Sequence, residues 1–261
     1  MRNPFDAVTT SYTRVRPAYP DSVVDRALSL PEGGTRRAVD LGAGTGKMTR
    51  MLLGRGVDVD AVEPSAAMRD QLAALGAGSA GAALVDGEGC LHVLDATAER
   101  TGLADGSEDL ATCAQAWHWV DEGAAAAELR RVLRPGGGVA IVWNQMDVSL
   151  PWVHRLCRIM RSGDVHRPDR PPHLGEGFTN PELMVEEWSD SMDPEQLLEL
   201  GTTRSSYLRA DAAGRRHMQD NLRWYLFEHL GLTAGETVEV PYSTLLWTSR
   251  RVSHGAVVSA A

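Results

Sequence analysis

The chain has 261 residues, and its 26 basic and 35 acidic side chains give a formal net charge of −9. Its 43% hydrophobic and 23% charged residues are ordinary for one large or two small globular domains, which excludes disorder over most of the chain. The acidic balance argues against a nucleic-acid or membrane partner, because both attract basic surfaces, although a local basic patch would escape this argument.

Targeting and metal-binding signals are missing from the sequence. No run approaches the roughly 18 apolar residues of a membrane span, and the first residues lack the apolar region of a signal peptide. Cys90, Cys113 and Cys157 lie far apart and match no zinc-binding spacing. We therefore expect a cytoplasmic protein with reduced cysteines and no metal site.

The first half of the chain alternates between helix and strand patterns. The patterns predict helices at 21–30, 46–53, 65–75 and 121–133, strands at 36–41, 57–62, 91–94, 110–114 and 139–143, and a loop at 76–90. Such alternation is typical of a doubly wound, mostly parallel sheet with helices on both faces. Ligands of these folds bind beyond the carboxyl ends of the strands.

After Trp143 the alternation stops. We expect a helix at 152–160, a helix opened by the pair Asp193-Pro194, a helix at 211–230 and a strand at 237–250 that Pro241 interrupts. This half is interpreted as a helical insertion into one domain, which then returns to complete the sheet.

A glycine-rich loop, AVDLGAGTGKMTR, carries the strongest signal. Asp40 ends a predicted strand, and Gly42, Gly44 and Gly46 follow at alternate positions before a helix. Glycines permit left-handed backbone and the close approach of a ligand, and the helix start offers unsatisfied N–H groups. The alternative is a purely structural turn.

Two other phosphate-binding loops fit this sequence less well. A Walker A loop needs glycine at Leu41 and serine or threonine at Met48. A dinucleotide-binding fingerprint needs its third glycine where Lys47 stands, so a nicotinamide oxidoreductase is disfavoured.

An acidic residue follows the second predicted strand. Glu63 precedes Pro64 and lies about twenty residues after the loop, where a ribose-binding carboxylate belongs. The alternative is a solvated glutamate at the start of a helix.

The form D-x-G-x-G-x-G resembles motif I of class I S-adenosylmethionine-dependent methyltransferases. Further segments resemble the type-11 subfamily, closely over residues 1–143 and loosely at the end: Phe5, Tyr12, Arg16-Pro17 and Tyr19-Pro20; Thr97-Ala98-Glu99; Ala114 to Trp119; Arg130 to Gly137; and Leu245 to Arg251. Many relatives carry aspartate at the position of Thr97, and Asp95 lies two residues earlier.

The resemblance implies one methyltransferase domain with a seven-stranded, mostly parallel, Rossmann-like sheet. Its parts would be an N-terminal lid (1–30), a cofactor-binding core (31–144), a helical substrate cap (145–235) and a closing antiparallel strand (236–251). The cofactor would be S-adenosylmethionine. The residues expected to bind it are Tyr12, Arg16, Asp40, Gly42, Ala43, Gly44, Gly46, Glu63, Pro64, Thr97, Ala98, Glu99 and Gln115.

His118 is the candidate catalytic base, because histidine titrates near neutral pH and this one follows the fourth strand. The alternative is a structural histidine bonded to the backbone. Trp117 and Trp119 would lie on opposite faces if the strand geometry continues, and Asn144 and Trp152 are further candidates for binding the acceptor.

We therefore predict methyl transfer to an oxygen, nitrogen or carbon atom of a small organic molecule, with a role in secondary metabolism, by a monomer or homodimer. Two alternatives stay open at this point. One is a protein of this fold that binds the cofactor without methylating, or that catalyses a rearrangement. The other is a nucleic-acid methyltransferase.

Overall fold

A computed structural model describes residues 14–76, 89–162 and 166–252. The chain forms two compact units. We call Tyr19–Trp143, Arg167–Val185 and Leu245–Ala261 the sheet unit, and Met1–Ala18, Asn144–His166 and Glu186–Thr244 the helical unit. The prediction of a single domain stays a prediction. None of the helices in the described ranges is long and apolar enough to cross a membrane.

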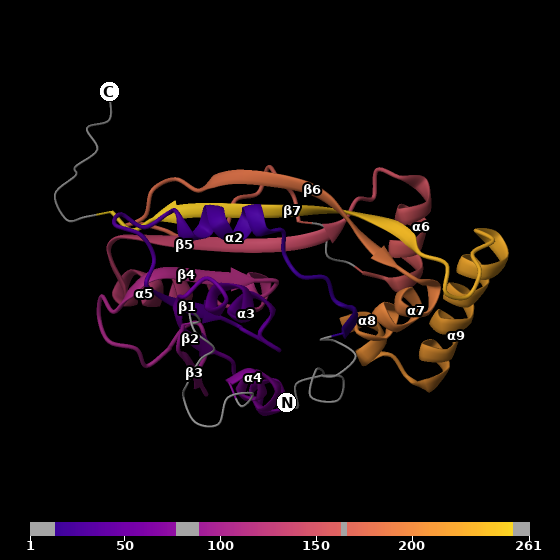
Figure 1. Ribbon diagram of the computed structural model, residues 1–261, viewed down its shortest axis with the longest axis horizontal. Coiled ribbons are helices and arrows are strands. Elements are labelled where there is room, and N and C mark those ends of the chain that lie inside the picture. Colours follow the sequence, from indigo (N-terminus) through magenta and orange to yellow (C-terminus); the bar gives the residue numbers. More distant parts are fainter. Residues whose placement is uncertain (1–13, 77–88, 163–165, 253–261) are drawn as a thin grey trace. The chain divides into compact units, whose positions relative to one another are not determined.

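Seven strands form one sheet in the order β3-β2-β1-β4-β5-β7-β6 (Figure 1). Their bounds are β1 Arg37–Leu41, β2 Asp58–Val62, β3 Leu91–Leu94, β4 Glu108–Ala114, β5 Leu133–Met146, β6 Glu182–Met192 and β7 Val238–Arg250. The pairs formed by β1 to β5 are parallel. Gly136 donates to the Arg251 carbonyl, and Arg251 donates to the Gly137 carbonyl, so β7 runs antiparallel to β5. The predicted fold class is confirmed.

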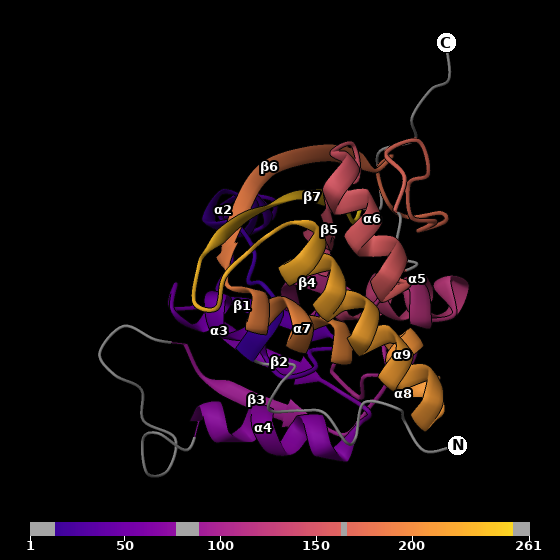
Figure 2. The same cartoon turned by 90° about the vertical axis from the view of Figure 1, so that its right-hand side faces the viewer.

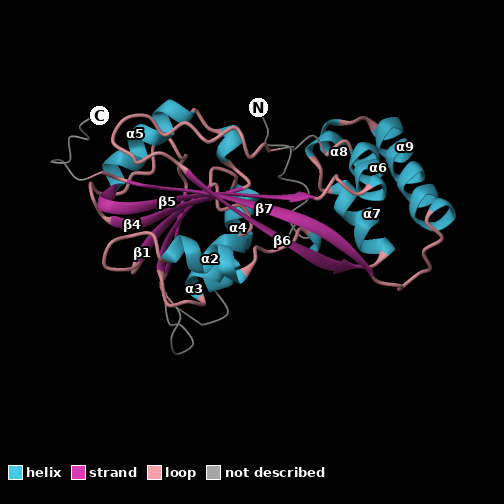
Figure 3. Cartoon of the chain, turned by 90° about the horizontal axis from the view of Figure 1, so that it is seen from above, coloured by secondary structure: helices cyan, strands magenta, loops and turns pink. Residues whose placement is uncertain are grey.

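Helices cover both faces of the sheet unit, with α5 on one face and α2 and α3 on the other (Figure 3). The bounds are α2 Asp21–Leu28, α3 Lys47–Leu53, α4 Ala66–Gly76 and α5 Glu122–Val132. Neighbouring residues of β1 serve different cores, because Ala38 packs with the α2 and α3 residues and Val39 packs with the α5 residues. Asp121 begins α5 by accepting a hydrogen bond from the Ala124 N–H at 3.0 Å.

The helical unit has its own apolar core, in which α6, α7 and α9 meet (Figure 2). Its helices are α6 Pro151–Met160, α7 Pro194–Thr202, α8 Ser205–Arg209 and α9 Ala212–Arg223, and a π-helix follows at Trp224–His229. A capping box between Asp193 and Gln196 begins α7, which agrees with the start predicted there.

The structure corrects several predicted elements. The insertion is not wholly helical, because β6 lies within it, and the predicted helix 211–230 continues after Arg223 as the π-helix. The sequence of β6 is rich in polar residues and has no strong apolar pattern. Its strand conformation therefore depends on pairing with β7. Pro241 does not interrupt β7, because its carbonyl still accepts from the Asp147 N–H at 2.9 Å. Of the predicted loop 76–90, residues 77–88 lie outside the described residues.

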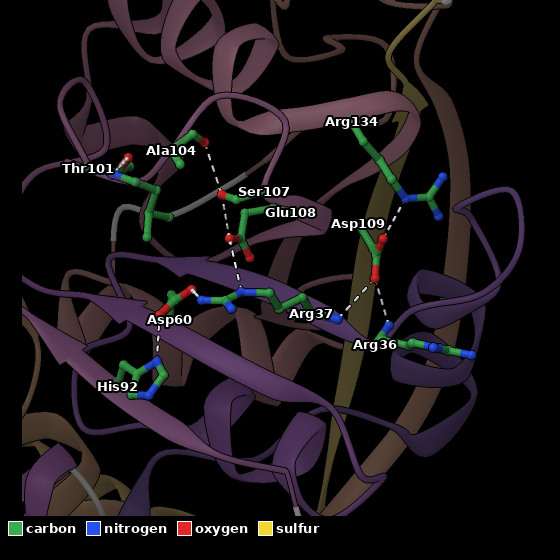
Figure 4. Close-up of polar contacts among 11 residues, drawn as sticks. Arg36, Arg37, Asp60, His92, Thr101, Ala104, Ser107, Glu108, Asp109 and Arg134 are labelled. Carbon is green, nitrogen blue, oxygen red and sulfur yellow. Dashed lines mark hydrogen bonds and ion pairs between the residues drawn. The ribbon is translucent and has the colours of Figure 1, made fainter.

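Charged side chains join the amino ends of the central strands (Figure 4). Arg37 pairs with Asp60 at 2.7 Å and with the buried Glu108 at 3.4 Å. Asp109 accepts from the backbone N–H groups of Arg36 at 2.8 Å and Arg37 at 3.0 Å, and it also pairs with Arg134. One carboxylate therefore connects the starts of β1, β4 and β5.

Replacing Asp109 with alanine should destabilise the sheet unit, because two backbone donors and one guanidinium lose their acceptor together. We expect a loss of about 2–3 kcal/mol in the free energy of unfolding, measured by urea titration. Asp105→Ala is the matched control, since that carboxylate is 81% exposed and pairs only with Arg131. Its loss should stay below about 1 kcal/mol. Equal losses in the two variants would contradict this role of Asp109.

Candidate functional site

The glycine loop joins the end of β1 to the start of α3. Gly42, Gly44 and Gly46 have φ values of +64°, +59° and +85°, in the left-handed region that glycine favours. A Cβ atom added at Gly42 would lie 2.6 Å from the Cβ of Ala116, which follows β4. The loop therefore needs glycine both for its backbone conformation and for its packing.

Glu63 lies beside this loop at the carboxyl end of β2. Its Oε2 accepts from the Gly44 N–H at 2.9 Å, and its Oε1 accepts from the Ser65 N–H at 2.8 Å. The residue is only 5% exposed, so these bonds fix the carboxylate. The two strongest sequence motifs thus meet in one place. A carboxylate is an acceptor-only group, which suits the hydroxyl donors of a ligand.

Thr45 is a candidate that the sequence interpretation missed. It lies within the loop and is 4% exposed, and within the described part of the chain its buried hydroxyl has no hydrogen-bond partner. A buried hydroxyl without a partner is unfavourable by about 1–3 kcal/mol, so such groups are candidates for meeting a ligand. The sequence did contain a signal for this candidate, because a threonine hydroxyl lies between two glycines of the loop.

Asp40 is buried directly before the loop. It accepts hydrogen bonds from the hydroxyls of Thr49 at 2.6 Å and Thr112 at 2.8 Å. Burial raises the pKa of Asp40 to about 6, although the two hydroxyls oppose the shift, and the charge of Glu63 adds to it. The site thus holds a carboxyl that titrates close to neutral pH.

The segment after β4 bends sharply. Gln115 has a φ of +58°, which is unusual for a residue other than glycine, and its N–H donates to the Val142 carbonyl at 2.8 Å. Such backbone strain is concentrated at functional sites. A 3₁₀ turn at Trp117–Trp119 follows, so the strand geometry does not continue, and the condition under which Trp117 and Trp119 would lie on opposite faces is not met. Trp117 is buried in the core on the α5 face, whereas His118 and Trp119 are exposed.

The turn after β3 contains Thr97, Ala98 and Glu99, three of the residues predicted to bind the cofactor. Thr97 forms an isolated bridge with Arg100, and Ala98 is buried. Glu99 accepts from the Asp121 N–H at 2.9 Å, which ties this turn to the start of α5. Asp95 pairs with Arg69 at 2.8 Å, so its carboxylate already has a cationic partner.

The predicted site residues divide between the two units. The sheet unit contains Asp40, Gly42, Ala43, Gly44, Gly46, Glu63, Pro64, Thr97, Ala98, Glu99, Gln115, Trp117, His118 and Trp119, whereas the helical unit contains Arg16, Asn144 and Trp152. Asn144 donates to the Ala18 carbonyl at 2.7 Å and accepts from Thr244 at 2.7 Å, and Trp152 is half-buried. Tyr12 lies outside the described residues.

Replacing Asp40 with asparagine should remove a pH dependence of the free energy of unfolding. The folded-state pKa of Asp40, about 6, exceeds its ordinary value of 3.8, so its contribution to stability is present at low pH and is lost as the pH rises through about 6. Between pH 5 and pH 7.5 the wild type should therefore lose about 1–2 kcal/mol relative to Asp40→Asn. Urea unfolding of both proteins at each pH measures the difference.

Asp105→Asn is the control for this pH profile, because its carboxylate is 81% exposed. Its stability should follow that of the wild type at every pH. A constant offset between Asp40→Asn and the wild type across this range would contradict the raised pKa.

Known proteins resemble this chain in sequence and in fold. Residues 39–141 match the family described as "Methyltransferase domain". An uncharacterized methyltransferase of Mycobacterium tuberculosis is 39% identical over 242 residues, which span 92% of this chain and 93% of the relative. A candidate type II methyltransferase from Anaeromyxobacter dehalogenans has a TM-score of 0.61 and 27% identity, and the match covers 92% of this chain and 99% of that one.

A more distant structure shares the fold alone. Phosphoethanolamine N-methyltransferase 2 of Haemonchus contortus, solved with S-adenosyl-L-methionine, has a TM-score of 0.54 and 14% identity, and the match covers 95% of this chain and 57% of that one. Because the mycobacterial relative matches nearly the whole chain at 39% identity, and because the loop geometry agrees with the family match, this protein belongs to the class I methyltransferase family, in which dependence on S-adenosylmethionine is general.

Proposed function

We propose that this protein transfers the methyl group of S-adenosylmethionine to a small organic acceptor. The proposal rests on the hydrogen bond that the Gly44 N–H donates to Glu63 at the carboxyl edge of the sheet. Ligands of doubly wound folds bind at this edge. The acceptor class, the cytoplasmic location and the role in secondary metabolism belong to the same proposal.

The residues present fit this cofactor. Glu63 would accept hydrogen bonds from the ribose hydroxyls, and Thr45 would donate its unpartnered hydroxyl to a polar part of the cofactor. Met68 is buried, and its sulfur lies 3.8 Å from the position that a Cβ atom of Gly44 would take. It offers apolar surface beside the loop. When bound, the cofactor supplies an activated methyl group on a sulfonium sulfur.

Residues after β4 would then serve the acceptor. His118 is exposed on the 3₁₀ turn, where it can take the proton that a hydroxyl or carbon acid loses. The neighbouring Trp119 is 57% exposed, which makes it an unusually open large apolar side chain. Its ring offers a surface for an apolar acceptor. Trp117, by contrast, is buried in the core of the sheet unit.

The N-terminal lid and the substrate cap are retained as proposals. Within the helical unit, Arg14 pairs with Glu199, and Arg16 donates to Thr203 at 2.9 Å and 3.1 Å. These contacts attach the described end of the N-terminal segment to α7 and the residue after it. A lid built on residues 1–30 would therefore be anchored through Arg14 and Arg16.

Replacing Glu63 with glutamine should weaken cofactor binding. The amide cannot accept from both ribose hydroxyls while it also accepts from the loop, so we expect a dissociation constant for S-adenosylmethionine about 10- to 100-fold higher. Isothermal titration calorimetry measures it. Glu176→Gln is the control, because Glu176 is exposed and lies away from the loop in sequence. Unchanged affinity in Glu63→Gln would contradict the assignment of the site.

His118→Gln tests whether His118 is the catalytic base. If the acceptor is a hydroxyl or a carbon acid, His118→Gln should lower turnover by roughly 10²–10⁴, with cofactor affinity nearly unchanged. If it is a carboxylate or a neutral amine, turnover should change little. Initial rates with deuterated-methyl cofactor, read by mass spectrometry, separate these cases. A fall in thermal stability in place of turnover would favour a structural histidine.

A further inference from the structure

A tyrosine hydroxyl is buried without a partner inside the helical unit. Tyr242 of β7 is 3% exposed, and its hydroxyl has no hydrogen-bond partner among the residues that the structure describes. Its ring stacks on Trp188, with centroids 5.1 Å apart and planes at 23°. Phenylalanine would fill this position without leaving a buried donor unsatisfied. The structure therefore shows no contribution of this hydroxyl to folding.

Two arginines interact electrostatically with this hydroxyl. Arg204 and Arg16 both act on it electrostatically, against one nearby carboxylate, Asp190. Cys157 is also close, and burial raises the pKa of its thiol, so it stays neutral near pH 7. The two guanidiniums act on this buried hydroxyl more strongly than the carboxylate does.

The arginines are held by the protein. Arg16 donates from Nε to the Thr203 hydroxyl at 2.9 Å and from Nη2 to the Thr203 carbonyl at 3.1 Å. Thr203 is fully buried and donates its own hydroxyl to the Leu200 carbonyl at 2.7 Å, which fixes this anchor. Arg204 follows directly and is 8% exposed. Arg16 is half-buried, so part of its side chain is accessible to solvent.

We infer that Tyr242, Arg204 and Arg16 form a binding site within the helical unit for a compact oxyanion, either a carboxylate or a phosphate. All three groups are donors, and an oxyanion is a pure acceptor that can take several charge-assisted hydrogen bonds. A cationic group would be repelled by this set, and a neutral acceptor would lack the charge assistance. The oxyanion site does not rest on the proposed function.

The protonation state of the hydroxyl agrees with this role. Burial raises the pKa of Tyr242 to about 12, although the charges of Arg204 and Arg16 oppose the shift. The hydroxyl therefore keeps its proton near pH 7 and is available as a donor.

Tyr242→Phe tests the site, because it removes only the hydroxyl. The probes are succinate, inorganic phosphate and succinamide, a neutral isostere of succinate. The wild type should be stabilised by one of the two anions and not by succinamide in thermal unfolding, and the responding anion identifies the oxyanion. In Tyr242→Phe the half-saturating concentration of that anion should rise at least tenfold. The melting temperature without ligand should stay unchanged or increase.

Tyr207→Phe is the matched control. Tyr207 also lies near an arginine, since the guanidinium carbon of Arg215 is 5.4 Å from the centroid of its ring, but Tyr207 belongs to α8 and is not part of the proposed site. It should bind the anion as the wild type does. Equal stabilisation by succinamide and succinate would overturn the inference. So would a lower melting temperature in Tyr242→Phe together with unchanged anion binding, because the hydroxyl would then have a structural role.

Methyl transfer and anion binding can fail independently. If the anion binds through Tyr242 but no labelled methyl group is transferred from S-adenosylmethionine to any acceptor, the proposed function fails and the oxyanion site stands. If methyl transfer proceeds equally well in Tyr242→Phe and the wild type binds neither anion, the oxyanion site fails and the proposed function stands.

Discussion

Parallel pairing of β1 with β2 is the constraint on which the site depends. Leu41 is the register partner of Val62, so Gly42 and Glu63 leave the sheet at the same level. The hydrogen bond from Gly44 to Glu63 follows from that register. A slip of one residue would turn the Glu63 side chain to the other face of the sheet and break this contact. Packing against two cores keeps the register, because neighbouring residues of β1 contribute to different cores.

Buried polar groups divide into two kinds in this protein. Asp40 accepts from two hydroxyls, and Asp109 accepts from two backbone N–H groups and an arginine, so their burial is compensated by hydrogen bonds. Thr45 and Tyr242 have buried hydroxyls with no partner, and each belongs to a different unit. Unsatisfied donors of this kind oppose folding, which is why they are the positions where a ligand has most to contribute.

Much of this could be predicted from residues that are close in the sequence. The spacing of Asp40, the loop glycines and Glu63 determined the central parallel strands and the cofactor loop, because local turn chemistry and strand length fix that arrangement. The capping residue Asp193 and the proline after it determined the start of α7. These features depend on a few neighbouring residues, so a single sequence contains them.

Other features were decided only by the tertiary structure. The 3₁₀ turn at Trp117–Trp119, the left-handed Gln115 and the strand β6 depend on distant segments, such as Val142 for the backbone of Gln115. The missing partner of the Thr45 hydroxyl could not be known without its surroundings. Tyr242, Arg204 and Arg16 are separated by up to 226 positions (242 minus 16), and no local pattern connects them. Only the folded core of the helical unit places two guanidiniums around one hydroxyl, because burial and charge are properties of the assembled chain.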